Sequence, residues 1–202
     1  MKEHLETERK YEADPDFAVP GLADLDGVAA VAGPDVQHLA ATYFDTADLR
    51  LVNHKITLRR RTGGADAGWH LKVPGPEGTR RELHEPLGPG GEPVPPPLAA
   101  LVADVTGDMP LRPVARLETE RTVRRLTDSS GNVLAEVADD LVTAWRTSEQ
   151  GSGASPDTWR EVEVELVSGS PGILDTVGAR LVESGARPSR SASKLARVLQ
   201  HP

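Results

Sequence analysis

Charged and apolar residues alternate with a period of two in two segments near opposite ends of the chain. One face of residues 5–12 carries Glu6, Glu8, Lys10 and Glu12, and one face of residues 158–167 carries Glu161, Glu163 and Glu165. Side chains two positions apart on a β-strand lie on the same face, roughly 6–7 Å from each other. A solvated outer face explains one such strand in isolation. Neighbouring carboxylates repel one another, however. A fold that contains both strands must therefore accommodate two strongly acidic strand faces.

Turn signals divide the rest of the chain into further short strands. The signals are Gly63-Gly64 and residues 74–76, 129–132 and 151–153, all rich in Gly, Pro, Ser or Asn. Strands are predicted over residues 5–12, 36–43, 56–62, 69–73, 79–87, 114–127, 133–145 and 158–167. Whether the strand over residues 114–127 is interrupted once stays open, and a turn is expected near Asp139-Asp140. Many short strands joined by hairpin-like turns predict an antiparallel sheet or barrel.

Helical patterns are fewer than strand patterns. Apolar residues at helical spacing, three of the runs following proline, predict helices over residues 22–31, 95–105, 173–182 and 193–199. The fold class is therefore α+β and mainly β, with a few flanking helices. At 202 residues the chain is expected to form one domain, residues 1–202, in which the Gly- and Pro-rich residues 88–97 are a surface linker.

The composition excludes several classes of protein. The absence of cysteine excludes disulfides, thiolate catalysis and iron–sulfur clusters. No apolar run is long enough for a transmembrane helix, and the charged residues 1–12 do not resemble a signal peptide, so a cytoplasmic location is expected. The net charge of −8 and the 3% aromatic content argue against nucleic-acid binding. The six histidines show no zinc-ligand spacing.

Basic residues gather on strands other than the two acidic ones. Arg59 and Arg61 share a face, Lys72 follows His70 by two positions, Arg80 shares a face with Glu82, Arg121 follows Thr119, and Lys194 lies near the end. In a barrel such faces can point inward and line a polar tunnel. An arginine guanidinium binds two phosphate oxygens at once, in a bidentate manner, and Mg²⁺ or Mn²⁺ prefers carboxylate oxygens. The pattern therefore indicates a tunnel for a metal-bound polyphosphate.

In their order along the chain, these residues resemble the CYTH domains, also called triphosphate tunnel metalloenzymes. Glu6-Thr7-Glu8-Arg9-Lys10 matches the E-x-E-x-K motif of that family. The later matches are Tyr43-Phe44-Asp45-Thr46, Leu58-Arg59-Arg60-Arg61, Leu71-Lys72, Arg80-Arg81-Glu82, Arg121, Glu136 with Asp140, residues 161–165 and Ser193-Lys194. The resemblance implies an eight-stranded antiparallel closed barrel around a tunnel. It also implies metal-dependent action on triphosphates, with Mg²⁺ or Mn²⁺ as cofactor.

The resemblance also implies a role for each matching residue. The implied metal ligands are Glu6, Glu8, Glu82, Asp140, Glu161 and Glu163. The implied triphosphate-binding residues are Lys10, Arg59, Arg61, Lys72, Arg80, Arg121 and Lys194. The implied catalytic residues are Glu6, Glu8, Lys10, Glu161 and Glu163.

Several positions stay open at this point. Thr119 stands where a second basic residue is common, and Arg116 is an alternative cation. Arg60 replaces a neighbour if the strand register is shifted by one residue. It also stays open whether Glu165 is a third acid that points inward and whether His70 approaches the tunnel. A further open question is whether Tyr11 or Trp159 stacks its ring on an organic part of the substrate.

The leading hypothesis is a metal-dependent triphosphatase that acts on inorganic tripolyphosphate or thiamine triphosphate. A class IV adenylate cyclase is a second hypothesis, disfavoured because few aromatic residues are available for an adenine. A polyphosphate-binding module without turnover is a third. The expected partner is a small-molecule triphosphate, with no nucleic acid or membrane, and the sequence carries no marker of oligomeric state.

Overall fold

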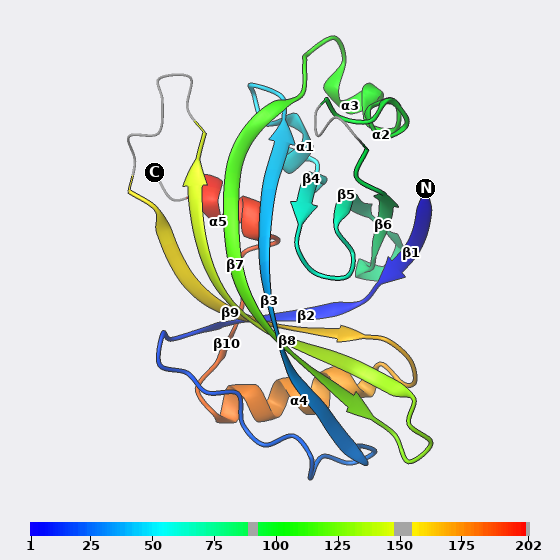
Figure 1. The fold of residues 1–202 in the computed structure, drawn as a ribbon, viewed down its shortest axis with the longest axis vertical. Helices are drawn as coiled ribbons and strands as arrows, with labels where there is room; N and C mark the ends of the chain where they lie inside the picture. The colour runs from blue at the N-terminus through cyan, green and yellow to red at the C-terminus, as the bar shows by residue number, and fades with distance from the viewer. Residues whose placement is uncertain (89–92, 148–154, 201–202) are drawn as a thin grey trace.

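A single antiparallel sheet dominates the fold (Figure 1). The computed structural model describes residues 1–88, 93–147 and 155–200. The strands are β1 (Lys2–Glu6), β2 (Glu8–Ala13), β3 (Ala30–Asp45), β4 (Thr57–Thr62), β5 (Gly68–Pro74), β6 (Arg80–Glu85), β7 (Arg112–Thr127), β8 (Val133–Arg146), β9 (Asp157–Leu166) and β10 (Arg187–Pro188). Their hydrogen-bonded order is β1-β6-β5-β4-β3-β7-β8-β9-β2-β10.

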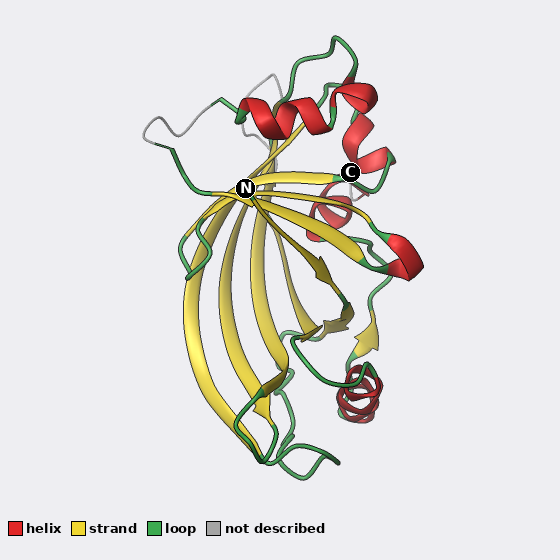
Figure 2. Ribbon diagram, turned by 90° about the vertical axis from the view of Figure 1, so that its right-hand side faces the viewer, coloured by secondary structure: helices red, strands yellow, loops and turns green. Residues whose placement is uncertain are grey.

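The N-terminal segment brings the two ends of this order together. β1 stands at one end and β2 next to the other, yet Thr7 alone separates them in the chain. In register, His4 of β1 lies opposite Glu82 of β6, and Lys10 of β2 lies opposite Glu163 of β9. The sheet must therefore curl, as the bent strands in Figure 2 show. The prediction of a mainly β, antiparallel, barrel-like fold with flanking helices is confirmed.

The details of the strands differ from the prediction. The expected first strand, 5–12, is divided at Thr7, and β10 is additional, so the described residues form ten strands rather than eight. The ladder of hydrogen bonds is not closed, because β1 and β2 are consecutive rather than paired. The predicted turn near residues 139–140 is wrong: Asp139 and Asp140 are paired with β7 on one side and with β9 on the other.

The predicted helix over residues 22–31 is also wrong. Residues 22–29 form turns and bends, and β3 begins at Ala30. The apolar spacing in this segment has another cause, since Leu22 and Leu25 are buried in the core beside β2, β8, β9 and the longest helix. Irregular chain can bury a few side chains in this way while its backbone stays at the surface.

Short helices cover the openings of the curled sheet. They are α1 (Arg50–Asn53), η1 (Pro76–Gly78), α2 (Pro96–Leu101), α3 (Ala103–Thr106), α4 (Gly172–Glu183) and α5 (Lys194–Gln200). The predicted helices over 95–105, 173–182 and 193–199 therefore form, the first as two pieces. None of the described helices is long and apolar enough to span a membrane. The predicted turn at 151–153 and part of the linker 88–97 lie outside the described residues.

Three apolar clusters surround the middle of the barrel. One lies under α4, where Leu174, Val177 and Leu181 repeat at helical spacing and are fully buried. A second contains Leu195 and Val198 of α5, and a third joins β4, β5 and β6 to α1 and α2. Residues between these clusters on the inward strand faces are charged. Val162 and Val164 of the first cluster alternate along β9 with Glu161 and Glu163, so that cluster lies on the face of the sheet opposite these charges. In the same way, Leu58 and Leu71 of the third cluster alternate with Arg59 and Lys72.

Candidate functional site: a charged cavity inside the sheet

A cavity of about 250 Å³ opens in the curled sheet, and its walls are mostly charged. Its basic lining residues are Lys10, Arg59, Arg61, Lys72, Arg80, Arg121 and Lys194, and its acidic ones are Glu6, Asp66, Glu82, Glu136, Glu163 and Glu165. His4, Tyr43, Thr57 and Ser193 complete the lining. All seven residues predicted to bind triphosphate therefore lie in one cavity, although they come from five strands and one helix.

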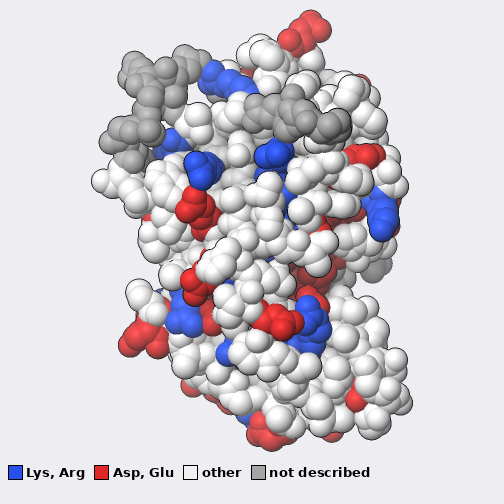
Figure 3. All heavy atoms as spheres, in the orientation of Figure 1, with Lys and Arg blue, Asp and Glu red and all other residues white. Residues whose placement is uncertain are grey.

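The outer surface differs from this interior. On the face drawn in Figure 3, basic and acidic side chains are interspersed, and those of the described residues form no continuous basic patch.

Two arginines of β4 form the basic wall of the cavity. Arg59 contacts the hydroxyl of Tyr43 at 3.3 Å, and Arg61 pairs with Asp66. The Nε atoms of both arginines are buried and have no hydrogen-bond partner among the residues that the structure describes. Burial, followed by repulsion from Arg59, lowers the pKa of Arg61 to about 10. Positive charge is therefore in excess at this wall, and an anion there would relieve it.

The Tyr43-Phe44-Asp45-Thr46 motif is largely architectural. Tyr43 lies opposite Arg59 in the β3–β4 ladder. Asp45 is fully buried, and its carboxylate accepts hydrogen bonds from the backbone N–H groups of Thr46, Leu51 and Val52 at 2.7, 2.8 and 3.0 Å. These bonds hold α1 against the end of β3, because they use the N–H groups that the first turn of a helix leaves without partners.

A second group of charges lies where β1 meets β5 and β6. The ammonium of Lys72 lies 2.6 and 2.7 Å from the two carboxylate oxygens of Glu6. His70 is buried between Glu82, 2.8 Å from its Nδ1, and the carbonyl of Asp66, 2.9 Å from its Nε2. Although burial opposes it, His70 and Lys72 hold the pKa of Glu82 well below its usual range. Glu82 therefore stays ionised and positions its two partners.

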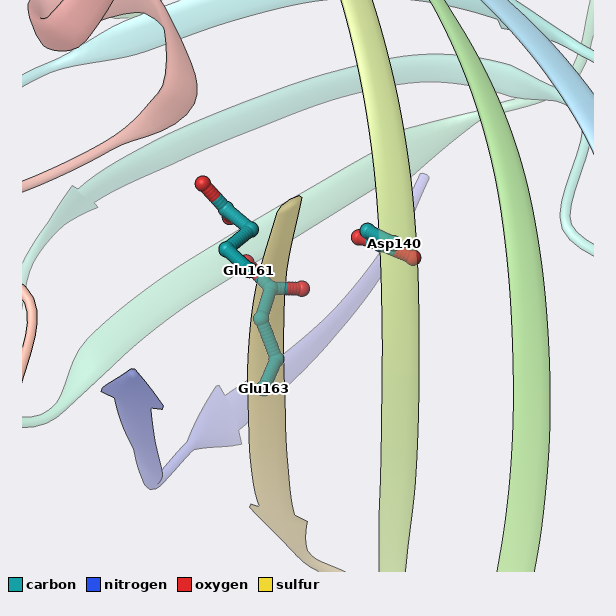
Figure 4. Close-up of side chains that lie close together, drawn as sticks. All are labelled: Asp140, Glu161 and Glu163. Carbon is teal, nitrogen blue, oxygen red and sulfur yellow. The ribbon is translucent and has the colours of Figure 1, made fainter. Parts of the chain in front are cut away.

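The largest ionic group centres on Lys194 of α5. Asp140 of β8 and Glu161 and Glu163 of β9 face one another across the neighbouring strands, with oxygens within 4.8 Å (Figure 4). The Lys194 ammonium lies 2.9, 2.6 and 2.9 Å from these three carboxylates, in that order. Burial by itself lowers the pKa of Lys194. The three carboxylates have the larger effect together and raise that pKa well above its usual value.

Two further cations surround the same group. Arg121 makes a bidentate pair with Asp140 at 2.8 and 2.6 Å and reaches Glu163 at 2.8 Å. Lys10 lies 2.7 Å from Glu163 and 3.0 Å from Glu8. Every carboxylate of this group is thus paired with at least one cation, and three of the predicted metal ligands are held in place by the predicted phosphate-binding residues.

Glu165 is the acid that the sequence left open, and its surroundings differ from those of the others. It lines the cavity and has no hydrogen bond or ion pair within the described part of the chain. Burial, followed by repulsion from Glu6, raises its pKa to about 7, and Glu8 and Glu163 add to the repulsion. Glu8 lies directly opposite Glu165 in the β2–β9 ladder. The signal in the sequence was the third glutamate of the Glu-Val-Glu-Val-Glu run.

The carboxylates around Glu165 are suitable ligands for a hard divalent cation. Glu6, Glu8, Glu163 and Glu165 offer carboxylate oxygens, the ligand type that Mg²⁺ and Mn²⁺ prefer. The raised pKa of Glu165 reflects negative charge that a cation would neutralise.

A family model for the CYTH domain matches residues 4–198. The chain belongs to the CYTH family. Two uncharacterised proteins from different strains of Mycobacterium tuberculosis are 41% identical to it over 206 residues, covering 97% of this chain. The chain spans 40% of the length of these curated relatives.

Solved structures share the fold of this CYTH domain. A candidate adenylate cyclase from Bacillus halodurans has a TM-score of 0.67 at 19% identity over 98% of both chains. A candidate adenylyl cyclase from Hippeastrum, described as having a dominant triphosphatase activity, has a TM-score of 0.53 at 21% identity over 97% of this chain and 95% of that chain. A Pyrococcus horikoshii protein has a TM-score of 0.56 at 14% identity over 98% and 99%.

The structure of this CYTH domain also places the positions that the sequence left open. Asp140 faces the cavity cluster, whereas Asp139 pairs with Arg160 at 2.8 and 2.7 Å. Arg116 is exposed and pairs with Glu118 at 2.7 Å, so it does not supply a second cation beside Arg121. Arg60 is not among the residues that line the cavity.

The remaining predicted residues lie at the edges of the cavity. Arg80 lines it and donates a hydrogen bond to the carbonyl of Ala192 at 2.7 Å. Tyr11 packs its hydroxyl end against Gly178 of α4, where a Cβ would lie 2.0 Å from the tyrosine oxygen. Trp159 donates from its indole nitrogen to Glu161 at 2.7 Å. Both rings are therefore packing residues, and neither lines the cavity.

Proposed function

We propose that this CYTH domain hydrolyses an inorganic triphosphate with the help of a divalent cation. The observation that carries the proposal is the pair of walls in one cavity. Arg59 and Arg61 present buried positive charge at one wall, and Glu165 presents at the other a carboxylate whose pKa is raised by burial and by repulsion from Glu6. A polyphosphate with its metal ion supplies the opposite charge to each wall.

Each group of the chain has a role in this proposal. Arg59, Arg61 and Arg121 bind phosphate oxygens in the bidentate manner of guanidinium, and Lys72 and Lys194 add point charges. Glu6, Glu8, Glu163 and Glu165 would hold the cation, which when bound withdraws negative charge from the phosphate oxygens.

The remaining predicted metal ligands have a supporting role. Asp140, Glu161 and Glu82 are hydrogen-bonded to cationic or aromatic side chains at 2.6–2.9 Å. We assign to them the orientation of those side chains, because they are not among the acids named as raising the pKa of Glu165, which are Glu6, Glu8 and Glu163. Orientation of this kind keeps the charges in place before the substrate binds.

The cavity favours a compact anion over a nucleotide. Its volume of about 250 Å³ lies below the range of roughly 300–1,000 Å³ typical of pockets for drug-sized ligands. Tyr43 is the single Phe, Tyr or Trp in the described lining, and its hydroxyl contacts Arg59. An adenylate cyclase needs a surface for the adenine, and this lining offers little apolar area for one. The description of the Hippeastrum protein as mainly a triphosphatase is in keeping with hydrolysis on this fold.

The test is a phosphate-release assay with tripolyphosphate, thiamine triphosphate, ATP and pyrophosphate, each with Mg²⁺, with Mn²⁺ and with a chelator. We expect metal-dependent phosphate release that is fastest with tripolyphosphate. Cyclic AMP formed from ATP would replace the proposal with a cyclase. Binding of tripolyphosphate without phosphate release over hours would replace it with a binding module.

A further inference from the structure

Trp159 lies where the inward face of β9 changes from apolar to charged. Its ring belongs to the apolar cluster that contains Leu195 and Val198 of α5. Its indole N–H points the other way and donates a hydrogen bond of 2.7 Å to Glu161 Oε2. Each of these two residues is only 5% exposed. The indole therefore connects the packed end of the barrel with the ionic centre.

The carboxylate of Glu161 uses both of its oxygens in this arrangement. Oε2 accepts from Trp159, and Oε1 accepts from the Lys194 ammonium at 2.6 Å. The terminal torsion of a glutamate is only weakly restricted by itself. Two hydrogen bonds on opposite oxygens fix the plane of the carboxylate, and that plane sets the direction in which Lys194 is held.

The same ring also anchors the helix that carries Lys194. The Arg197 guanidinium lies 4.8 Å from the centre of the Trp159 ring, and its Nη1 lies 3.7 Å from Glu12 Oε1. Lys194 and Arg197 are three positions apart on α5 and therefore share a helix face. Trp159 thus contacts α5 through Arg197 and, through Glu161, also restrains Lys194.

We infer that Trp159 is a positioning residue that fixes the Lys194 ammonium in the cavity wall by holding Glu161. The importance of this for triphosphate binding rests on the proposed function. The positioning itself does not, because it concerns contacts within the protein. Without the indole N–H, a buried carboxylate oxygen lacks its donor, and Lys194 is held less firmly between Asp140, Glu161 and Glu163.

The first test observes Lys194 without any ligand. The substitution Trp159→Phe keeps an aromatic ring beneath Arg197 and removes the N–H. Trp145→Phe is the matched control, since Trp145 also carries an arginine, Arg116, at 6.0 Å from its ring centre, on the opposite face of β8 from Asp140. With only five lysines in the chain, the ammonium signals of ¹⁵N-lysine-labelled protein are few, and Lys194→Ala identifies the one from Lys194.

We expect Trp159→Phe to shift or broaden the Lys194 ammonium signal and Trp145→Phe to leave it unchanged. A Lys194 signal that is the same in wild type and Trp159→Phe would overturn the inference. Loss of the dispersed amide spectrum in Trp159→Phe would mean that the residue supports the fold as a whole, which also overturns it.

The second test measures coupling in the binding of inorganic tripolyphosphate by calorimetry, without metal. Trp159→Phe should weaken binding by about tenfold in the wild-type background. In the Lys194→Ala background the same substitution should change binding by less than about twofold, because the residue acts through Lys194. An equal loss in both backgrounds would contradict this route. Absence of binding by the wild type both without metal and with Mg²⁺ would refute the proposed function, while the ammonium signal would still decide the positioning role.

Discussion

The two walls of the cavity treat charge in opposite ways. Around Lys194, three carboxylates and three cations pair at 2.6–2.9 Å, and both oxygens of Glu161 are in use. At the wall formed by β4, the buried Nε atoms of Arg59 and Arg61 have no hydrogen-bond partner within the described residues. Paired charges hold the barrel and orient side chains, whereas charges without a partner remain available to a ligand. Substitutions on the two walls should therefore differ in kind.

The largest expected effect is a loss of stability on removal of the Lys194 side chain. Lys194→Ala leaves Asp140, Glu161 and Glu163 with too few cations, and breaking a buried ion pair from one side costs about 3–5 kcal/mol. The midpoint of thermal unfolding should fall by at least about 6 °C at pH 8. Lys2→Ala, on the exposed part of β1, is the control. A fall of under about 2 °C would show that the two walls do not differ as described.

Removal of Arg59 should affect activity and spare the fold. Arg59→Ala should lower kcat/KM for tripolyphosphate by about 100-fold or more, since one preorganised donor to a developing charge contributes about that factor. The unfolding midpoint should change little, because Arg61 loses a repelling neighbour while Glu82 loses an attracting one. Arg116→Ala on the outer face is the control for both measurements. A large loss of stability in Arg59→Ala would contradict the distinction between the walls.

Neutralisation of Glu165 should stabilise the protein at alkaline pH. The pKa of Glu165 is about 7 in the folded protein against 4.5 for an ordinary glutamate, so the folded state binds the proton more tightly. The stabilisation due to that proton is complete below pH 4.5 and is lost as the pH rises through 7. Glu165→Gln should therefore raise the unfolding midpoint by about 4–8 °C at pH 8 and leave it unchanged at pH 4.5.

Calorimetry of Glu165→Gln at both pH values, without and with Mg²⁺, checks this prediction. Glu118→Gln, an exposed acid of β7, is the control. An unchanged midpoint at pH 8 would mean that Glu165 is not destabilised by its neighbours. An equal response of wild type and variant to Mg²⁺ would remove Glu165 from the proposed cation ligands.

The smallest effect is expected at Asp139, next to the paired wall. Asp139 pairs with Arg160, which is partly exposed, so Asp139→Asn should cost about 1 kcal/mol or less. Tripolyphosphate turnover should stay within about twofold of wild type, whereas Asp140→Asn should reduce it further. Steady-state kinetics on the two variants, which differ by one position in the chain, test which face of β8 belongs to the site.

The sequence predicted the lining of the cavity better than it predicted the chain between strands. Alternation with a period of two put Arg59 with Arg61, and His70 with Lys72, on shared strand faces, because residues of one parity must share a sheet face. The resemblance to the CYTH family added Lys194, which lies on α5 and not on a strand. Residues 22–29 were mistaken for a helix because a few buried leucines imitate helical spacing. The pairing of charges could not be predicted, since Lys194 meets Asp140 and Glu161 only through folding. For the same reason Glu165 stayed an open question.

The division of the N-terminal segment at Thr7 has a mechanical consequence. Glu6 ends β1 and Glu8 begins β2, so the two acids of the first motif belong to opposite ends of the sheet. The carbonyl of Thr7 accepts a hydrogen bond from Leu166 at 2.9 Å, which pins this junction to β9. Any ligand that Glu6 and Glu8 hold together would therefore join strands from the two ends of the sheet at this junction.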